Sequence, residues 1–300
     1  MNRWSVILLS ATAALWLPTA APADALPITA GLVLQLDASD VDGDGLTDTP
    51  TALTALATWA DKSPGGNDVA NGSAAAQPNQ VPGVLNGLPV VRFTGSEWLY
   101  RSDALGFTGN PAATIFAVTV NVPDVGANDS RLMQFGADGV GENTQFQTYA
   151  FAIESSWRYN NGNRVFAGDP LDLPSANIGV WLSAPGTNYG QKEFYRNGTT
   201  AATQTGANNP NNVSNLLDEG LGVGGAWVPN NGDVAAPSRF LTGDLAEVLV
   251  FDRDLTADEM NQVGYYLQTK WAVAAGTFTP EPATLALIVL GAVPLLRRRR

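Results

Sequence analysis

The chain has 300 residues, and its 28 acidic residues outnumber its 16 basic ones, which gives a formal net charge of −12. It contains neither cysteine nor histidine, which excludes disulfides, thiolate and histidine metal sites, and catalysis by Ser-His-Asp or Cys-His groups. The negative charge argues against nucleic acid or an anionic lipid surface as a partner. Divalent cations are the charged partner that this composition favours.

The first 25 residues have the pattern of a secretory signal peptide. Arg3 precedes an apolar run over residues 4–17, and Ala23-Asp24-Ala25 supplies the small residues that signal peptidase requires. We expect cleavage after Ala25, which leaves residues 26–279 as one large all-β domain. Five basic and two acidic residues lie outside 26–279, so this region carries a net charge of about −15.

The first predicted strand, residues 31–36, is followed by an acidic loop with calcium-loop spacing. Carboxylates alternate along residues 40–48, and Gly45 stands at the sixth position, where such loops turn sharply. The twelfth position is Thr51 instead of a bidentate Glu, so a calcium ion would need another carboxylate or would bind weakly. An acidic turn that stays solvated is the alternative. The predicted ligands are the carboxylates of Asp40, Asp42, Asp44 and Asp48 and the carbonyl of Leu46.

Short apolar segments separated by Gly, Asn, Asp and Pro indicate an all-β fold throughout the middle of the chain. Their β-branched and aromatic content favours strands. Asn197-Gly198 is a favoured pair for a tight hairpin turn. Besides residues 31–36, the predicted strands are residues 89–93, 114–122, 146–153, 180–184, 192–195, 199–201 and 240–251.

The tryptophans divide into two groups. Trp59, Trp98, Trp181 and Trp271 stand in strand or helix patterns, and we expect them in the core. Two others stand beside amide and carboxylate groups in predicted loops, where an aromatic face could stack on a sugar ring. These Asn-Gly clusters could also be simple turns. The predicted carbohydrate-binding residues are Trp157, Tyr159, Asn160, Asn161, Trp227, Asn230 and Asn231.

No residue is predicted to be catalytic. Glycoside hydrolysis needs two carboxylates about 5–10 Å apart. Asp244 and Glu247 are three residues apart on a predicted strand, so we expect them on opposite faces. We expect Glu247 to have a structural role, such as hydrogen-bonding the sheet to a loop. Carboxylates distant in sequence could still meet in space, which leaves hydrolysis as an alternative.

One helix is predicted near the C-terminal end of the domain. Thr256 is its expected N-cap, and Glu259 completes a capping box at the third helical position. The apolar residues recur at spacings of three and four, which is typical of a helix that packs on a sheet. They are Met260, Val263, Leu267 and Trp271.

The last 21 residues combine a Pro-Glu-Pro triplet, a short apolar run over residues 283–296, and a basic end. The run is shorter than the roughly 20 residues of a stable spanning helix and contains Pro294, so it suits a transient inner-membrane anchor with a cytoplasmic basic end. The pattern resembles the PEP-CTERM sorting signal of Gram-negative bacteria that make exopolysaccharide, which implies processing by an exosortase-type enzyme. An ordinary tail anchor is the alternative. The signal residues are Pro280, Glu281, Pro282, Arg297, Arg298, Arg299 and Arg300.

Several segments between residues 31 and 271 resemble the concanavalin A-like lectin/glucanase superfamily, in its laminin G-like branch of bacterial surface proteins. The resemblance implies an all-β jelly-roll sandwich of two antiparallel sheets with one short C-terminal helix. It also implies a non-catalytic domain, because the Glu-x-Asp-x-x-Glu motif of the superfamily's glucanases is absent from this sequence. The segments that carry it are residues 34–39, 58–63, 66–68, 86–93, 195–198, 222–225 and 243–253.

Taken together, these patterns predict an exported, non-catalytic carbohydrate-binding or scaffolding protein of the cell envelope, cell surface or exopolysaccharide matrix. Its expected partners are the exopolysaccharide and an exosortase-type enzyme, and calcium is its expected ion. A polysaccharide-degrading glycoside hydrolase and a protein-binding adhesion module are the alternatives.

Overall fold

The structure is a computed structural model that describes residues 25–109, 111–122, 131–136, 146–150, 155–159, 163–167, 175–183, 192–203, 216, 218, 220–225, 229–230, 233–234 and 240–280. For residues 146–150, 155–159, 163–167, 192, 199–203, 229–230 and 233–234 it describes the backbone alone. Residues 1–24 and 281–300 of the predicted signal peptide and sorting signal lie outside these ranges, so both signals stay predictions.

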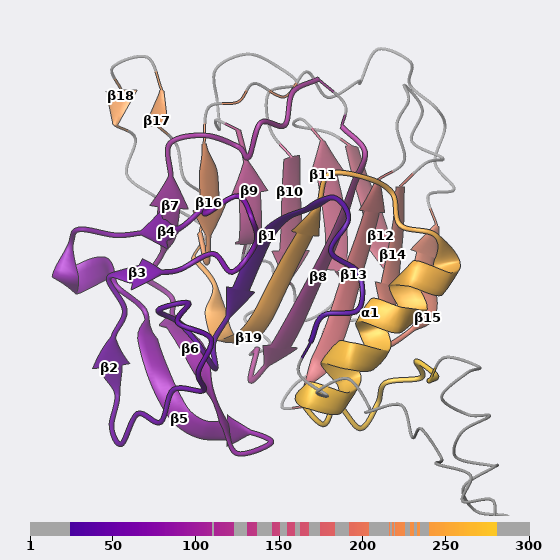
Figure 1. The fold of residues 1–300 in the computed structure, drawn as a ribbon. Helices are drawn as coiled ribbons and strands as arrows, with labels where there is room; N and C mark the ends of the chain where they lie inside the picture. The colour runs from indigo at the N-terminus through magenta and orange to yellow at the C-terminus, as the bar shows by residue number, and fades with distance from the viewer. Residues whose placement is uncertain are drawn as a thin grey trace, which may run out of the picture.

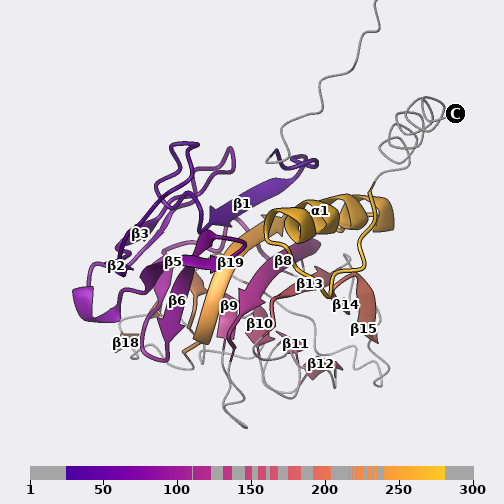
Figure 2. The same ribbon diagram turned by 90° about the horizontal axis from the view of Figure 1, so that it is seen from below.

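Two antiparallel sheets form a sandwich, and helix α1 (Ala257–Lys270) lies across the outer face of the first sheet (Figures 1 and 2). The first sheet has the strand order β15 (Thr199–Thr203), β14 (Lys192–Arg196), β13 (Asn177–Ser183), β8 (Ala113–Val120), β19 (Thr242–Phe251), β6 (Leu88–Thr94), β5 (Asn79–Leu85) and β2 (Thr54–Ala55). Strand β1 (Leu32–Asp37) pairs with β19 outside this order.

The second sheet has the order β12 (Asn163–Ala167), β11 (Ser155–Tyr159), β10 (Phe146–Ala150), β9 (Arg131–Phe135), β16 (Leu221–Val223), β7 (Leu99–Arg101), β4 (Val69–Ala70) and β3 (Thr58–Trp59). A small hairpin, β17 (Pro229–Asn230) and β18 (Asp233–Val234), and a 3₁₀ turn, η1 (Ala74–Ala76), complete the described elements. The predicted all-β sandwich of two antiparallel sheets with one short helix is confirmed for the described part of the chain.

The centre of the first sheet is buried on both sides. Every residue of β8 is buried, as are nine of the ten residues of β19. Strands covered on both faces have near-continuous apolar sequences, and β8 (ATIFAVTV) is of this kind. The second sheet covers one face of this centre and α1 lies over the other (Figure 2).

Three of the four tryptophans predicted to lie in the core do so. Trp59, Trp181 and Trp271 are fully buried. Trp98 is only half-buried, so its predicted place in the core is wrong. The reason is its position just before β7, where it points to the opposite side from the fully buried Leu99.

The predicted hairpin turn is confirmed. Asn197 and Gly198 connect β14 and β15, and both have left-handed backbone conformations, with φ of 52° and 87°. A type I′ turn requires positive φ at both central residues, which explains the Asn-Gly pair.

Helix α1 begins with the predicted capping box. The Glu259 backbone N–H donates to the Thr256 hydroxyl at 3.3 Å, and the Thr256 backbone N–H donates to Glu259 Oε2 at 2.9 Å. The Arg253 guanidinium donates to both carboxylate oxygens of Glu259, at 2.9 and 2.8 Å. Hydrogen bonds from Arg253 and Thr256 therefore lower the pKa of Glu259 to about 2.

We expect Glu259→Gln to lower the free energy of unfolding at pH 7 by about 0.5–1 kcal/mol, because the carboxylate is partly exposed and screened. Since the folded-state pKa lies below the usual 4.5, the stabilisation is complete above pH 4.5 and is lost as the pH falls toward 2. The melting-temperature difference between wild type and variant should therefore shrink from pH 7 to pH 3. An unchanged difference would contradict this role of the carboxylate.

Candidate functional site

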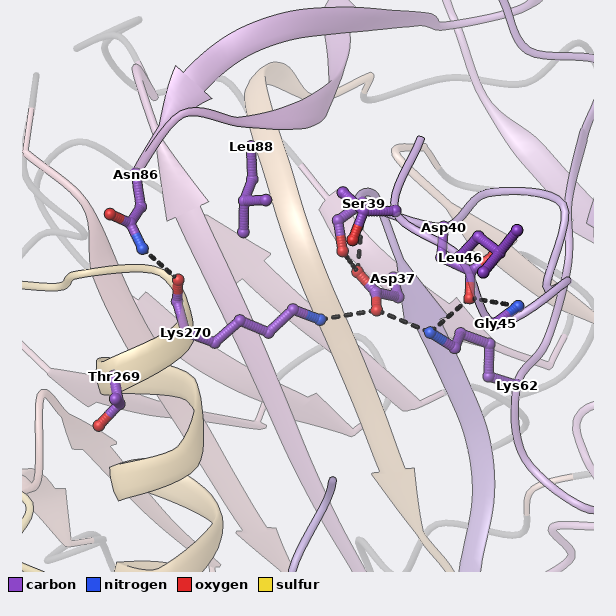
Figure 3. A pocket seen from close by; sticks show the side chains of 11 residues that line it. Asp37, Ser39, Asp40, Gly45, Leu46, Lys62, Asn86, Leu88, Thr269 and Lys270 are labelled. Atoms are coloured by element: carbon purple, nitrogen blue, oxygen red, sulfur yellow. Dashed lines mark hydrogen bonds and ion pairs between the residues drawn. The ribbon is translucent and has the colours of Figure 1, made fainter. Parts of the chain in front are cut away.

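A pocket of about 420 Å³ lies beside the C-terminal end of α1 (Figure 3). One wall is the loop that follows β1, and the other is formed by the turn between β5 and β6 together with the last turn of the helix. None of its eleven described lining residues is aromatic. The walls instead carry four charged side chains, those of Asp37, Asp40, Lys62 and Lys270.

The charges around this pocket form one connected network. The Lys270 ammonium lies 2.6 Å from Asp37 Oδ2 and 2.8 Å from Glu247 Oε2. The Lys62 ammonium lies 3.0 Å from Asp37 Oδ2 and 2.6 Å from Asp40 Oδ2 (Figure 3). Asp37 and Glu247 come together because they are paired residues on the adjacent strands β1 and β19.

Glu247 joins the sheet to helix α1. It is fully buried, and its carboxylate accepts hydrogen bonds from Trp271 Nε1 at 2.8 Å and Tyr266 Oη at 3.1 Å. Gln35 Nε2 donates to it from β1 at 3.0 Å. The structural role predicted for Glu247 is therefore confirmed, although its partners lie on the helix and a neighbouring strand and not in a loop.

The network shifts the pKa values of its members in different directions. Burial raises the pKa of Glu247, and the Lys270 ammonium opposes this only in part. Burial would also raise the pKa of Asp37, but the Lys270 and Lys62 ammonium groups outweigh it and the pKa is lowered. Glu247 therefore accepts a proton more readily than Asp37.

The predicted placement of Asp244 and Glu247 on opposite faces is wrong. Strand β19 changes register between Leu245 and Glu247, so Asp244 lies opposite Val120 and Glu247 opposite Val118 on β8. The extra residue of this bulge restores the period of two and places both carboxylates on one side. Both are fully buried, and the Arg92 guanidinium binds Asp244 at 2.6 and 2.8 Å.

The acidic loop brings three of its four predicted carboxylates together. One carboxylate oxygen from each of Asp40, Asp42 and Asp44 lies within 4.8 Å of the others. Asp48 has a different role, because its Oδ2 accepts hydrogen bonds from the Val41 backbone at 2.8 Å and from Gln80 Nε2 at 2.9 Å. The side chain of Leu46, whose carbonyl was the fifth predicted ligand, is 69% exposed.

An aromatic pair on the second sheet was not predicted. The rings of Trp98 and Tyr100 stack with centroids 4.7 Å apart and an angle of 21° between their planes, and both residues are half-buried. Since Leu99 between them is fully buried, the pair lies on the outward face of the sheet. In register, Tyr100 is flanked by Gly222 of β16 and Ala70 of β4. The alternation Trp98-Leu99-Tyr100 is the only trace of the pair in the sequence, and three residues are too few for a recognisable strand pattern.

The predicted carbohydrate-binding residues stay a prediction. Trp157 and Tyr159 were expected in a loop, but they belong to strand β11. Asn230 belongs to β17. The structure describes only the backbone of these two strands. The remaining members, Asn160, Asn161, Trp227 and Asn231, lie outside the described residues.

No protein-family model and no curated protein sequence matches the chain. Among solved structures, it is similar to a Trypanosoma rangeli sialidase in complex with sialic acid, with 17% identity over 84% of this chain and 35% of the sialidase, at a TM-score of 0.46. It is similar to domain 4 of AbnA, a GH43 extracellular arabinanase from Geobacillus stearothermophilus in complex with arabinotriose, with 12% identity over 80% of this chain and 99% of that domain, at a TM-score of 0.41.

It is also similar to the Ruminococcus gnavus IT-sialidase CBM40 bound to α2,3 sialyllactose, with 12% identity over 59% of this chain and 96% of that chain, at a TM-score of 0.41. The chain spans 35% of the length of the sialidase. All three TM-scores are below 0.5, so none of these similarities assigns a substrate or an activity to this protein.

Proposed function

We propose that this protein binds carbohydrate, or scaffolds a carbohydrate matrix, without catalysis. The observation that carries this proposal is the stacked pair of Trp98 and Tyr100 on the outward face of the second sheet. A sugar ring presents C–H groups on its faces and hydroxyl groups at its edge, so a partly exposed aromatic ring can pack against the apolar face. The residues at the register positions that flank Tyr100 are the small Gly222 and Ala70.

The proposed destination is the cell envelope, the cell surface or an exopolysaccharide matrix. It is supported by the signal-peptide pattern of residues 1–25 and by the PEP-CTERM-like pattern of residues 280–300. An exosortase-type enzyme would process the latter after a transient inner-membrane stage. Among the residues that the structure describes, no helix is long and apolar enough to span a membrane. The laminin G-like branch of the concanavalin A-like superfamily remains the family that the sequence resembles.

Native gels cast with the exopolysaccharide of the producing bacterium test the binding proposal. Residues 26–279 contain all the described elements, and they should be retarded in such gels. Trp98→Ala should raise the dissociation constant derived from the retardation roughly tenfold, because it removes one ring of the pair. Tyr265→Ala is the control, since it removes a half-buried aromatic ring from α1 over the other sheet. Equal retardation of wild type and Trp98→Ala would reject this binding surface.

The same gels separate the alternatives. A glycoside hydrolase would release reducing sugar, and replacing one of its carboxylates would stop the release while the fold persists. An adhesion module would show no retardation by the polymer and would retain a protein partner in excess polysaccharide. We expect retardation without any released sugar.

A further inference from the structure

We propose that the loop of residues 40–48 binds one calcium ion through the carboxylates of Asp40, Asp42 and Asp44. These residues occupy the first, third and fifth positions of a calcium-loop pattern, and the structure places an oxygen of each within 4.8 Å of the others. The side-chain ligands of an ion among them would all be carboxylate oxygens. Calcium prefers oxygen ligands of this kind. This metal site is independent of the proposed carbohydrate surface, which lies on the other sheet.

The backbone of the loop turns sharply at two glycines and is closed by hydrogen bonds. Gly43 and Gly45 have φ of 71° and 85°, which lets the chain turn sharply between the acidic residues. The Gly45 backbone N–H donates to Asp40 Oδ2 at 3.1 Å, and the Leu46 N–H donates to Asp44 Oδ1 at 2.8 Å. The Asp48 backbone N–H closes the loop on the Ser39 carbonyl at 2.7 Å.

A second observation points to Asp40 as a cation ligand. Asp40 is only 2% exposed, and its Oδ1 is buried and accepts no hydrogen bond from any described group. A buried anionic oxygen without a partner is costly, and a coordinated metal ion would satisfy it. The other oxygen, Oδ2, is occupied by Lys62 and the Gly45 backbone, so Oδ1 is the atom that remains for a ligand.

The ion would order the wall of the pocket beside α1. Asp40, Gly45 and Leu46 line that pocket (Figure 3). Thr47 belongs to the same wall. Asp42 and Asp44 are exposed residues of the same loop. Three carboxylates with one lysine at their edge leave a net negative site, which favours a divalent cation. Since Thr51 replaces the bidentate Glu of the twelfth position, we expect a dissociation constant of about 0.1–1 mM.

Titration of CaCl₂ into the metal-stripped full-length chain, kept in mild detergent and followed by calorimetry, tests the site. We expect one ion per chain and a rise in melting temperature of about 3–6 °C at 10 mM calcium. The double variant Asp42→Asn/Asp44→Asn should weaken binding at least tenfold. These two residues are exposed, so their replacement leaves the packing of the buried Asp40 in place.

Asp254→Asn is the matched control, because it removes an exposed carboxylate that follows the C-terminal end of β19, outside the acidic loop. This variant should bind calcium as the wild type does. Three results would overturn the proposal: no heat and no melting shift at 10 mM calcium, equal binding by the double variant, or an equal response to MgCl₂. None of these results bears on the retardation by polysaccharide, so the two proposals fail separately.

Discussion

Replacement of Lys270 by methionine should lower the free energy of unfolding by about 3–5 kcal/mol. The side chain of Lys270 is 8% exposed, and its ammonium is the cation that lies against both Asp37 and the fully buried Glu247. Methionine keeps the apolar stem but leaves Glu247 with neutral hydrogen-bond donors alone among its described partners. Urea unfolding at pH 7 measures the loss.

Two further variants show whether the loss comes from the charge. Lys62→Met should lower the free energy of unfolding by clearly less. The Lys62 side chain is 24% exposed, and Asp37 retains its ion pair with Lys270 in this variant. Adding Glu247→Gln to Lys270→Met should restore part of the stability, since the uncompensated carboxylate is then absent. Equal losses in both lysine variants, or no recovery in the double variant, would contradict the ion network.

Trp271→Ala should lower the free energy of unfolding by about 3–5 kcal/mol, whereas Trp98→Ala should lower it by less than about 1.5 kcal/mol. Trp271 is fully buried at the end of α1 and donates its indole N–H to Glu247 at 2.8 Å. Trp98 is half-buried on the outward face of the second sheet. Both variants remove an indole ring, so urea unfolding compares the environments of the two tryptophans directly. Equal losses would place Trp98 in the core and remove the proposed binding surface.

Features set by local sequence were predicted correctly. The capping box of Thr256 and Glu259 lies within four residues, and it fixes the start of α1 wherever the helix packs. The turn at Asn197 and Gly198 is equally local. Strands β8 and β19 were predicted from their runs of β-branched and apolar residues, and the structure buries both faces of these strands.

Features set by pairing between distant segments were not predicted. Strands β7 and β16 have three residues each, too few for a recognisable pattern, so the outward position of Trp98 was missed. The bulge in β19 that brings Asp244 and Glu247 to one side is a property of its register with β8. The network of Lys270 with Asp37 joins residues 233 positions apart, and no spacing rule links them.

The measurement that tests carbohydrate binding by the aromatic pair most directly is an NMR titration of the tryptophan indole N–H signals. Residues 26–279 labelled with ¹⁵N would be titrated with oligosaccharides cut from the exopolysaccharide, and single Trp→Phe variants would assign the signals. We predict that the Trp98 signal shifts, while the signals of the fully buried Trp59, Trp181 and Trp271 stay in place. No shift at any indole, or shifts confined to Trp157 or Trp227, would contradict binding at β7.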